Sequence, residues 1–341
     1  MILLSKLNDV PFEGYAGKDM ENKREKRPPL IILTGPTAVG KTKLSIELAK
    51  ELSGEIISAD SMQVYRRMDI GTAKIRPEEM EGIPHHLIDI LDPKEPFDVV
   101  QFQTLARQKV QEILDRGHMP IIVGGTGFYI QALLYDIDFS EEAENALRDE
   151  LEKLAETEEG RQALVEELRR VDPASLEKIH PNNIKRVIRA VEYFQIHGAP
   201  ISRHNEVQRE KTSPYDSRYF VLTDDRAKLY ARIEQRVDQM LEEGLVEEVR
   251  GLVAQGLNRD HISMQGIGYK EILDYLEGKC DLDTAVNTLK LNTRHFAKRQ
   301  LTWFRREREV IWLDRTILTD DDMIMAEIRK YLDGLKVSAD Q

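Results

Sequence analysis

Residues 35–42 have the types and spacing of a loop that binds phosphate groups. They read GPTAVGKT, which fits G-x-x-x-x-G-K-[ST], and they lie between an apolar run and a helical pattern. The glycines allow backbone N–H groups to turn toward phosphate oxygens, and the start of the helix adds its positive dipole end. The Lys41 ammonium would reach the terminal phosphate, and the Thr42 hydroxyl could bind Mg²⁺. The motif predicts a di- or triphosphate ligand and leaves its identity open.

Asp60 is a second candidate, in the segment ISADSMQVYRR. It directly follows a short apolar run, and open α/β sheets bind ligands beyond the carboxyl ends of their strands. A carboxylate there could accept a proton from a nucleophile that lies against the phosphate donor. Because Asp before Ser also begins many helices, position alone does not separate a general base from an N-cap. Ser61, Gln63 and Tyr65 follow as polar groups that could contact a substrate edge.

The usual metal-binding partner of such a loop is not evident. P-loop NTPases usually have an apolar strand that ends in Asp. Here PIIVGGTG ends in glycines and Thr126, and HLIDI offers only Asp89 as an imperfect match. A small-metabolite kinase, which can carry a glycine-rich turn there, and a nucleotide-switched binding protein therefore stay open as alternatives.

The elements that must position these residues alternate between strands and helices. Strands alternating with helices, with strands that read as apolar runs, predict an α/β fold with a P-loop NTPase-like parallel sheet. The predicted strands cover residues 30–34, 55–59, 86–90, 120–123, 219–222 and 310–313, and the predicted helices cover 41–52, 97–116, 225–256, 268–277 and 282–307.

A change of composition divides the chain. Residues 139–214 are rich in Glu, Leu, Ala and Arg and contain no clear strand, which predicts a helical insertion domain. The catalytic core then comprises residues 29–138 and 215–320. We expect residues 1–28 to form a poorly ordered N-terminal arm and residues 321–341 a C-terminal helix and tail.

Composition restricts the class of protein. The 341 residues are 41% hydrophobic and 32% charged, as in ordinary soluble proteins, and no apolar run has the length of a membrane span. The N-terminus lacks the apolar segment of a signal peptide. Cys280, the single cysteine, excludes an internal disulfide and a multi-cysteine zinc site, and it fits the cytosol. The net charge of −12 does not itself suggest nucleic-acid binding, so the distribution of charge matters more than the sum.

Basic residues gather in two segments. Residues 293–309 combine basic side chains with interleaved aromatic ones, a composition typical of nucleic-acid-binding surfaces. A helix that buries its aromatic residues and exposes its charges would show the same pattern, and both interpretations can hold together. The second set has helical spacing that puts its members near one face. The first set is Arg294, Lys298, Arg299, Arg305, Arg306 and Arg308 with Phe296, Trp303 and Phe304, and the second is Lys185, Arg186 and Arg189.

Two adjacent histidines, His85 and His86, could suggest a metal site. No cysteine or third clustered histidine accompanies them in the sequence, so we interpret them as structural.

Eight ordered segments resemble the tRNA dimethylallyltransferases, also called tRNA isopentenyltransferases. The lone cysteine cannot build the zinc finger of some eukaryotic members, so the resemblance is to the bacterial type. The arm of residues 1–28 departs from the family, whose members usually start close to the first strand. The segments are GPTAVGKT, ADSMQVYRRMDIGTAK, PHHLIDILDP, VGGTGFYIQAL, HPNNIKRVIRAVE, LYARIEQRVDQMLEEGLVEEV, QGIGYKE and TRHFAKRQLTWFR, in the order of the family and over nearly all of residues 30–313.

The resemblance implies a reaction and roles for the candidate residues. The family transfers a dimethylallyl group from dimethylallyl pyrophosphate to N6 of the adenosine 3′ of the anticodon (position 37) in tRNA, with the help of Mg²⁺. Asp60 would take the N6 proton, Thr126 would lie near the transfer path, and Arg232 would close over the pyrophosphate, with Arg236 as its competitor. The pyrophosphate would lie in the loop of Gly35, Pro36, Thr37, Ala38, Val39, Gly40, Lys41 and Thr42, with Thr42 at the metal.

The resemblance also implies how tRNA binds. The target base must leave the stacked anticodon loop and enter a channel. We expect the insertion domain to clasp the anticodon stem-loop of a single tRNA, and the protein to act as a cytoplasmic monomer without a membrane. The residues that the resemblance places at the tRNA are Asp60, Ser61, Met62, Gln63, Arg148, Asn183, Ile184, Lys185, Arg186, Val187, Gln265, Gly266, Ile267, Gly268, Tyr269, Lys270, Arg294, Arg299 and Arg305.

Overall fold

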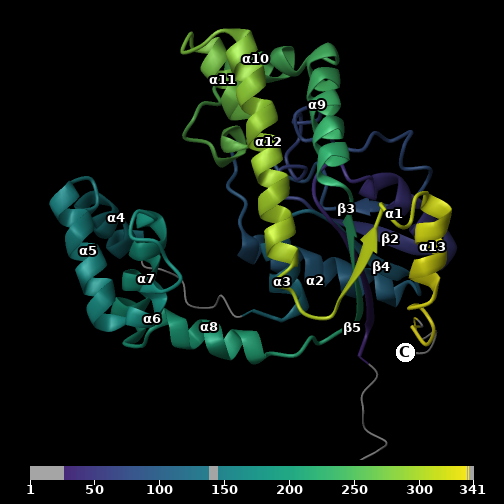
Figure 1. Ribbon diagram of the computed structural model, residues 1–341, viewed down its shortest axis with the longest axis horizontal. Coiled ribbons are helices and arrows are strands. Elements are labelled where there is room, and N and C mark those ends of the chain that lie inside the picture. The colour runs from purple at the N-terminus through teal and green to yellow at the C-terminus, as the bar shows by residue number, and fades with distance from the viewer. Residues whose placement is uncertain (1–26, 138–144, 336, 338–341) are drawn as a thin grey trace, which may run out of the picture.

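The structure is a computed structural model that describes residues 27–137, 145–335 and 337. Nearly all of the predicted N-terminal arm lies outside these residues. The centre of the molecule is a parallel sheet with the strand order β3-β2-β4-β1-β5-β6 (Figure 1), which confirms the predicted α/β fold. The strands are β1 (Pro29–Thr34), β2 (Gly54–Ala59), β3 (His85–His86), β4 (Met119–Gly124), β5 (Asp216–Thr223) and β6 (Val310–Asp314).

Helices cover both faces of the sheet, which is why its strands read as continuous apolar runs. Leu30 and Ile32 of β1 face one core, which includes side chains of α2 (Val99–Asp115) and α3 (Gly127–Leu134). Ile31 and Leu33 face the other, which includes α1 (Lys41–Leu52) and α13 (Asp321–Arg329). The carboxyl ends of the strands therefore meet along one edge, above which the remaining core helices stand (Figure 1).

Two predicted elements are shorter than expected, for reasons in the backbone. In place of the strand expected over residues 86–90, the structure has β3, which comprises only His85 and His86. The chain turns away after it at Leu87 and Asp89, whose φ angles are 61° and 55°. The helix expected over residues 225–256 is broken at Gly244, whose φ of 101° is incompatible with a continuous helix. It forms α9 (Arg226–Glu242) and α10 (Leu245–Ala254).

Above the carboxyl edge, the chain builds a group of helices that returns to the sheet. It comprises α9, α10, the short 3₁₀ helix η1 (Ile262–Gln265), α11 (Tyr269–Leu276) and α12 (Leu282–Phe304). The long helix α12 packs against α9 and α11 and comes down onto α3, so its C-terminal half lies beside the ends of the strands (Figure 1).

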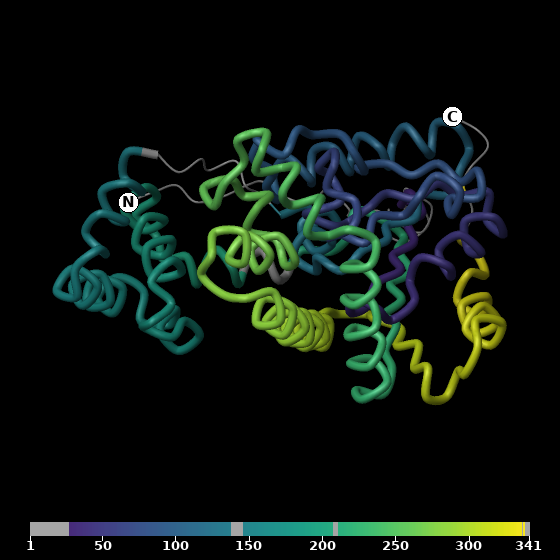
Figure 2. The backbone as a smooth tube through the Cα atoms, turned by 90° about the horizontal axis from the view of Figure 1, so that it is seen from above, coloured from purple at the N-terminus to yellow at the C-terminus, as the bar shows by residue number. Residues whose placement is uncertain are grey.

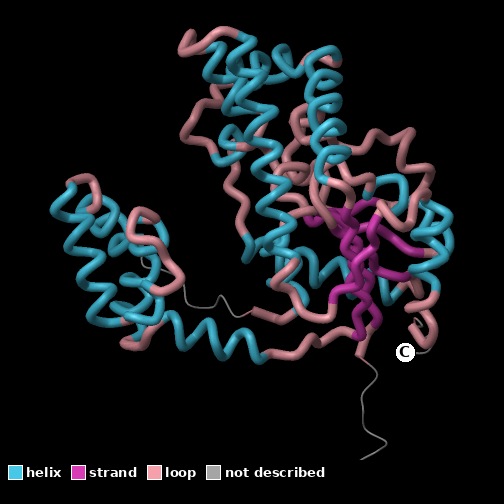
Figure 3. Tube along the Cα trace, viewed as in Figure 1, coloured by secondary structure: helices cyan, strands magenta, loops and turns pink. Residues whose placement is uncertain are grey.

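The described residues between α3 and β5 form helices and their connections, with a small core of their own (Figure 3). Asp172 fixes this unit: its side chain accepts hydrogen bonds from Ser175 and Ser202 on two different helices. Seen from above, the unit lies beside α12, away from the sheet (Figure 2). The helices are α4 (Asn145–Leu154), α5 (Glu158–Val171), α6 (Pro173–Leu176), α7 (Ile184–His197) and α8 (Ile201–Glu210).

No helix within the described ranges combines the length and the apolar character needed to cross a bilayer.

Candidate functional site

The predicted phosphate loop joins β1 to α1 and is shaped by two glycines. Gly35 has a φ of 148°, and a Cβ added there would lie 2.6 Å from the carbonyl oxygen of Leu222, so only glycine fits. Gly40 adopts a φ of 96° and precedes the first residue of α1. The loop therefore presents the start of α1 and its unpaired N–H groups at the carboxyl edge of the sheet, as anion binding requires.

Lys41 folds back over this loop. Its Nζ donates hydrogen bonds to the carbonyl oxygens of Gly35 (3.0 Å) and Pro36 (2.8 Å). Burial, together with the positive charge of Arg236, lowers the pKa of Lys41 to about 7, although the negative charge of Asp60 opposes the shift. An anion in the loop would favour the charged ammonium and reverse this shift.

Asp60 follows β2 at the same edge. Its Oδ1 accepts hydrogen bonds from the backbone N–H groups of Met62 (2.8 Å) and Gln63 (3.3 Å). No helix follows, so Asp60 caps a tight turn rather than a helix, and Oδ2 has no hydrogen bond to any described residue. Burial raises the pKa of Asp60, although its two backbone donors and the charge of Lys41 oppose this. A carboxylate with one free oxygen and a raised pKa is suited to accept a proton.

Thr126 lies next to Asp60 because β2 and β4 are neighbours. Its backbone N–H donates to the carbonyl oxygen of Ala59 at 3.2 Å, and Ala59 pairs with Gly124 in the sheet register. Thr126 is half-buried, and its hydroxyl does not cap α3. The predicted candidates of these two strand ends are therefore brought together.

Gln300 is a site residue that the sequence did not predict. From α12 its side-chain oxygen accepts a hydrogen bond from the backbone N–H of Thr37 (2.9 Å), and its side-chain nitrogen donates to the carbonyl oxygen of Gly125 (2.9 Å). It thus joins the phosphate loop to the turn that carries Thr126, and it is 6% exposed. The available signal was a polar residue between Ala297 and Phe304 on the buried face of a helix.

Arg232 and Arg236, the two alternative predictions for the arginine at the pyrophosphate, have different surroundings. Arg232 Nε donates to the carbonyl oxygen of Ala38 (2.8 Å), and its Nη2 pairs with Asp224 (2.6 Å). Arg236 is half-buried and makes no hydrogen bond or ion pair with any residue that the structure describes. Its charge nevertheless contributes to the lowered pKa of Lys41, which places it near the loop.

The weaker metal-binding candidates have other partners. Asp89 forms an ion pair with Lys74 at 2.5 Å. His85 bonds to the carbonyl oxygen of Ile83 and His86 to the carboxylate of Glu55, which agrees with structural roles. Within the described part of the chain, no group of three or more His, Cys, Asp or Glu side chains could hold a metal ion.

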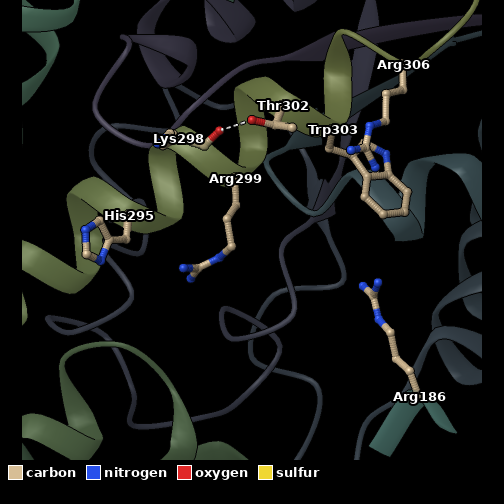
Figure 4. Close-up of a pocket in the computed structure, with 7 residues that line it drawn as sticks. All are labelled: Arg186, His295, Lys298, Arg299, Thr302, Trp303 and Arg306. Carbon is tan, nitrogen blue, oxygen red and sulfur yellow. Dashed lines mark hydrogen bonds between the residues drawn. The ribbon is translucent and has the colours of Figure 1, made fainter. Parts of the chain in front are cut away.

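A basic hollow of about 410 Å³ lies between the insertion and α12 (Figure 4). Arg186 approaches from α7, while His295 and Arg299 project from α12, and Lys298 also lines the hollow. The hollow is also lined by Thr302, Trp303 and Arg306, and none of its lining residues is acidic. Trp303 contacts Phe128 edge to face at 6.0 Å between ring centroids and also lines the hollow, whereas Phe304 is 0% exposed and packs in the core.

The structure sorts the other residues predicted at the tRNA. Lys185, Asn183, Gln265 and Arg305 are exposed, and Met62, Gly266, Ile267, Lys270, Ser61 and Ile184 are partly so. Arg148 pairs with the buried Glu192, and Arg294 pairs with Glu234. Two of these expectations need correction, because the side chains of Val187 and Tyr269 are both 0% exposed. The expectation that Tyr65 contacts a substrate edge is also wrong, because Tyr65 is 0% exposed. Val187 belongs to the insertion core, and the Tyr269 hydroxyl donates to Glu248, so neither side chain forms part of a binding surface.

Comparisons with known proteins agree on one family. A family model described as IPP transferase matches residues 63–307. A tRNA dimethylallyltransferase of Lachnoclostridium phytofermentans is 60% identical over 305 residues, which cover 89% of this chain and 97% of that protein. The protein of the same name from Geobacillus thermodenitrificans is 52% identical over 306 residues, which cover 89% of this chain and 96% of that protein.

Solved structures extend the likeness to three dimensions. The full-length tRNA isopentenylpyrophosphate transferase of Bacillus halodurans matches with a TM-score of 0.69 and 49% identity, over 91% of this chain and 97% of that one. A eukaryotic dimethylallyltransferase acting on tRNA matches with a TM-score of 0.75 and 31% identity, over 89% of this chain and 77% of that one.

Proposed function

The chain belongs to the IPP transferase family, and we propose that it transfers a dimethylallyl group from dimethylallyl pyrophosphate to N6 of adenosine 37 in tRNA. The observation that carries this proposal is the meeting of a phosphate loop and a half-buried carboxylate at one sheet edge, with Lys41 and Asp60 close enough to influence each other's pKa. This arrangement suits a reaction that releases pyrophosphate and removes one proton. We expect the protein to act as a monomer, in the cytoplasm, where tRNA is modified.

The chemistry assigns a task to each group. The bond between the allylic carbon and the pyrophosphate oxygen breaks, the bond between that carbon and N6 forms, and the N6 proton passes to Asp60. An exocyclic adenine amine is a weak nucleophile, so the protein must stabilise the leaving pyrophosphate and accept the proton. The loop N–H groups, Lys41 and Arg236 supply positive charge for the pyrophosphate, and Thr126 lies beside the path between donor and base.

The residues also fit the Mg²⁺ that this chemistry would use. Mg²⁺ keeps several waters and takes few protein ligands besides phosphate oxygens, so a dedicated carboxylate cage is not required. The Thr42 side chain is exposed at the start of α1, and its hydroxyl bonds to no other described residue, so Thr42 would hold the ion. When bound, Mg²⁺ would neutralise negative charge on the pyrophosphate.

The hollow between α7 and α12 is the proposed site for the RNA backbone. Arg186 and Arg299 from opposite sides of it would contact phosphates, with Lys298 and Arg306 beside them. The flipped adenosine would enter beside Asp60, Ser61 and Gln63.

The deciding experiment supplies Mg²⁺, radiolabelled dimethylallyl pyrophosphate and an anticodon stem-loop. We expect label to enter the RNA, and we expect no labelling when adenosine 37 is replaced by purine riboside, which lacks the amine. Asp60→Asn keeps an oxygen for the Met62 and Gln63 donors but removes the base, so transfer should fall by about 10²-fold or more while stem-loop affinity stays the same. If affinity falls as far as the rate, Asp60 is not the base. Transfer of the ATP terminal phosphate to a small molecule, without RNA labelling, would instead support the kinase.

A further inference from the structure

One carboxylate fastens the loop after Asp60 to the helices above the sheet. Glu248 of α10 accepts hydrogen bonds from three consecutive backbone N–H groups and from one hydroxyl. Its Oε2 accepts from Asp69 (2.9 Å) and Ile70 (2.8 Å), and its Oε1 accepts from Gly71 (3.0 Å) and the Tyr269 hydroxyl (2.6 Å). All four partners are donors, so only an acceptor with two oxygens satisfies them all, as an ionised carboxylate does.

Hydrogen bonds, joined by short stretches of the chain, connect Glu248 to Asp60. Gly71 donates to Glu248, and the carbonyl oxygen of the next residue, Thr72, accepts a hydrogen bond from the side-chain nitrogen of Gln63 at 3.2 Å. The backbone N–H of Gln63 in turn donates to Asp60 Oδ1 at 3.3 Å. The orientation of Asp60 therefore depends on the position of residues 69–72.

The loop after Asp60 also packs closely on the segment of residues 262–269. A Cβ added at Gly71 would lie 2.6 Å from the ring of Tyr269, and one added at Gly266 would lie 2.7 Å from Met62 Sδ. The two segments thus touch at both ends, and Glu248 and Tyr269 together hold one of those contacts. Both segments are among those assigned to the tRNA above.

We propose that Glu248 is a positioning residue for the transfer reaction: it holds the Asp60 loop against residues 262–269, so that one rigid surface receives the adenosine and aims the base at N6. This inference rests on the proposed function. Glu248 makes no hydrogen bond to a described residue of the phosphate loop, since its four hydrogen-bond partners lie in residues 69–71 and at Tyr269.

Glu248→Gln tests the proposal, and Glu247→Gln is its matched control. The amide of Gln keeps the volume but turns one acceptor into a donor, which opposes the existing donors. Glu247 is the neighbouring residue and is exposed, and its one ion-pair partner among the described residues is Arg250 at 3.4 Å. We expect kcat to fall about 10-fold or more in Glu248→Gln, because a small misplacement of a reacting group has effects of this order. KM for dimethylallyl pyrophosphate should change less than about 2-fold, because the phosphate loop keeps its contacts.

Hydrogen exchange of the full-length protein distinguishes positioning from local support. In Glu248→Gln the backbone amides of residues 69–71 should lose protection, and so should those of Met62 and Gln63, while exchange in the phosphate loop stays as in the wild type. Loss confined to residues 69–71 with unchanged kcat would overturn the proposal, as would an equal loss in kcat and donor binding. If the wild-type protein transfers no dimethylallyl group, the proposed function fails. Exchange at Met62 and Gln63 then still shows whether the connection exists.

Discussion

Arg232 and Arg236 lie one turn apart on α9, yet of the two only Arg232 forms an ion pair with a residue that the structure describes. Arg232 bonds to the phosphate loop at Ala38 and pairs with Asp224, whose side chain is 4% exposed. Arg236 is half-buried, without a hydrogen bond or ion pair among the described residues. The nearby charge of Glu79 acts on Arg236 without forming an ion pair, so this half-buried cation beside a phosphate loop is still available to an anion. We infer that Arg236 binds the pyrophosphate and that Arg232 supports the loop.

Alanine substitutions should separate these two roles. Arg236→Ala removes a half-buried charge that has no ion-pair partner among the described residues, so we expect unchanged or higher thermal stability and about 10-fold or more weaker binding of dimethylallyl pyrophosphate. Arg232→Ala leaves Asp224 buried without its partner, so the free energy of unfolding should fall by about 1–3 kcal/mol. Donor titration and thermal unfolding of both variants check this. If Arg232→Ala is stable and loses more donor affinity than Arg236→Ala, the assignment is reversed.

The lowered pKa of Lys41 makes donor binding depend on pH. With a pKa of about 7, set first by burial, Lys41 is mostly neutral at pH 8 in the free protein. The pyrophosphate favours the charged ammonium, so binding should take up a proton at pH 8, and affinity should weaken by up to about 10-fold per pH unit above 7. Calorimetry in two buffers with different ionisation enthalpies measures this uptake.

Lys41→Ala is the reference for that measurement, because the donor itself also titrates. Subtracting the variant leaves the part that belongs to Lys41. Lys43→Ala is the matched control, since Lys43 is exposed and pairs with Asp321 on the far helix α13. We expect Lys43→Ala to keep the wild-type pH dependence, and equal proton uptake by the wild type and Lys41→Ala would contradict the model.

The sequence predicts most of the strands and the two loops that carry the chemistry, because these are local properties. GPTAVGKT and Asp60 each follow an apolar run, and a parallel sheet must bring such ends to one edge. What a sequence does not reveal is which distant side chain completes a loop. Gln300 and Thr37 are 263 residues apart, and Glu248 and Gly71 are 177 apart. Their contacts depend on how α12 and α10 pack, and although both residues lie in segments that resemble the family, nothing local in those segments identifies their partners.

The same limit explains the two residues that were wrongly placed at the tRNA. Val187 lies between the basic Arg186 and Arg189, but helical periodicity turns it into the core of the insertion. Tyr269 follows Gly266 and Gly268 in a segment that reads as a surface loop, but its ring packs on Gly71. Neighbourhood along the chain therefore selects segments, whereas the direction of each side chain within a segment depends on the packing.

The cations of α12 should differ in their effect on tRNA. Arg299 is exposed and lines the basic hollow, whereas Arg294 is paired with Glu234. Each phosphate contact releases counterions, so Arg299→Ala should weaken binding of the stem-loop and reduce the slope of log K against log salt by about 0.7–0.9. Arg305→Ala should act in the same direction. Arg294→Ala should change the slope by less than about half as much, because its charge is already partly neutralised. An unchanged slope in Arg299→Ala would show that Arg299 contacts no phosphate.

A buried carboxylate at the amino end of the sheet, opposite the site, should make the stability of the fold depend on pH. Glu55 of β2 is 2% exposed and accepts hydrogen bonds from Arg116 (2.7 Å), His86 (2.6 Å) and His118 (2.8 Å). Burial alone would raise the pKa of Glu55, but these hydrogen bonds outweigh it and lower the pKa from 4.5 to about 2. The carboxylate therefore stabilises the fold by about 3 kcal/mol above pH 4.5, and this contribution is lost as the pH falls from 4.5 toward 2.

Glu55→Gln should remove this contribution at pH 7 and flatten the acid side of the stability curve. The expected loss is about 2–3 kcal/mol in the free energy of unfolding, because Arg116 and two histidines lose a charged acceptor. Glu47→Gln is the control, since the Glu47 side chain on α1 is partly exposed and its one ion-pair partner among the described residues is Lys43 at 3.6 Å, a pair worth less than about 0.5 kcal/mol. Denaturant unfolding at pH 7 and at pH 4 measures both. Because Glu55 lies at the edge of the sheet away from Lys41 and Asp60, kcat of the folded variant should stay at the wild-type value. Equal stability of the two variants would mean that the network is solvated rather than buried.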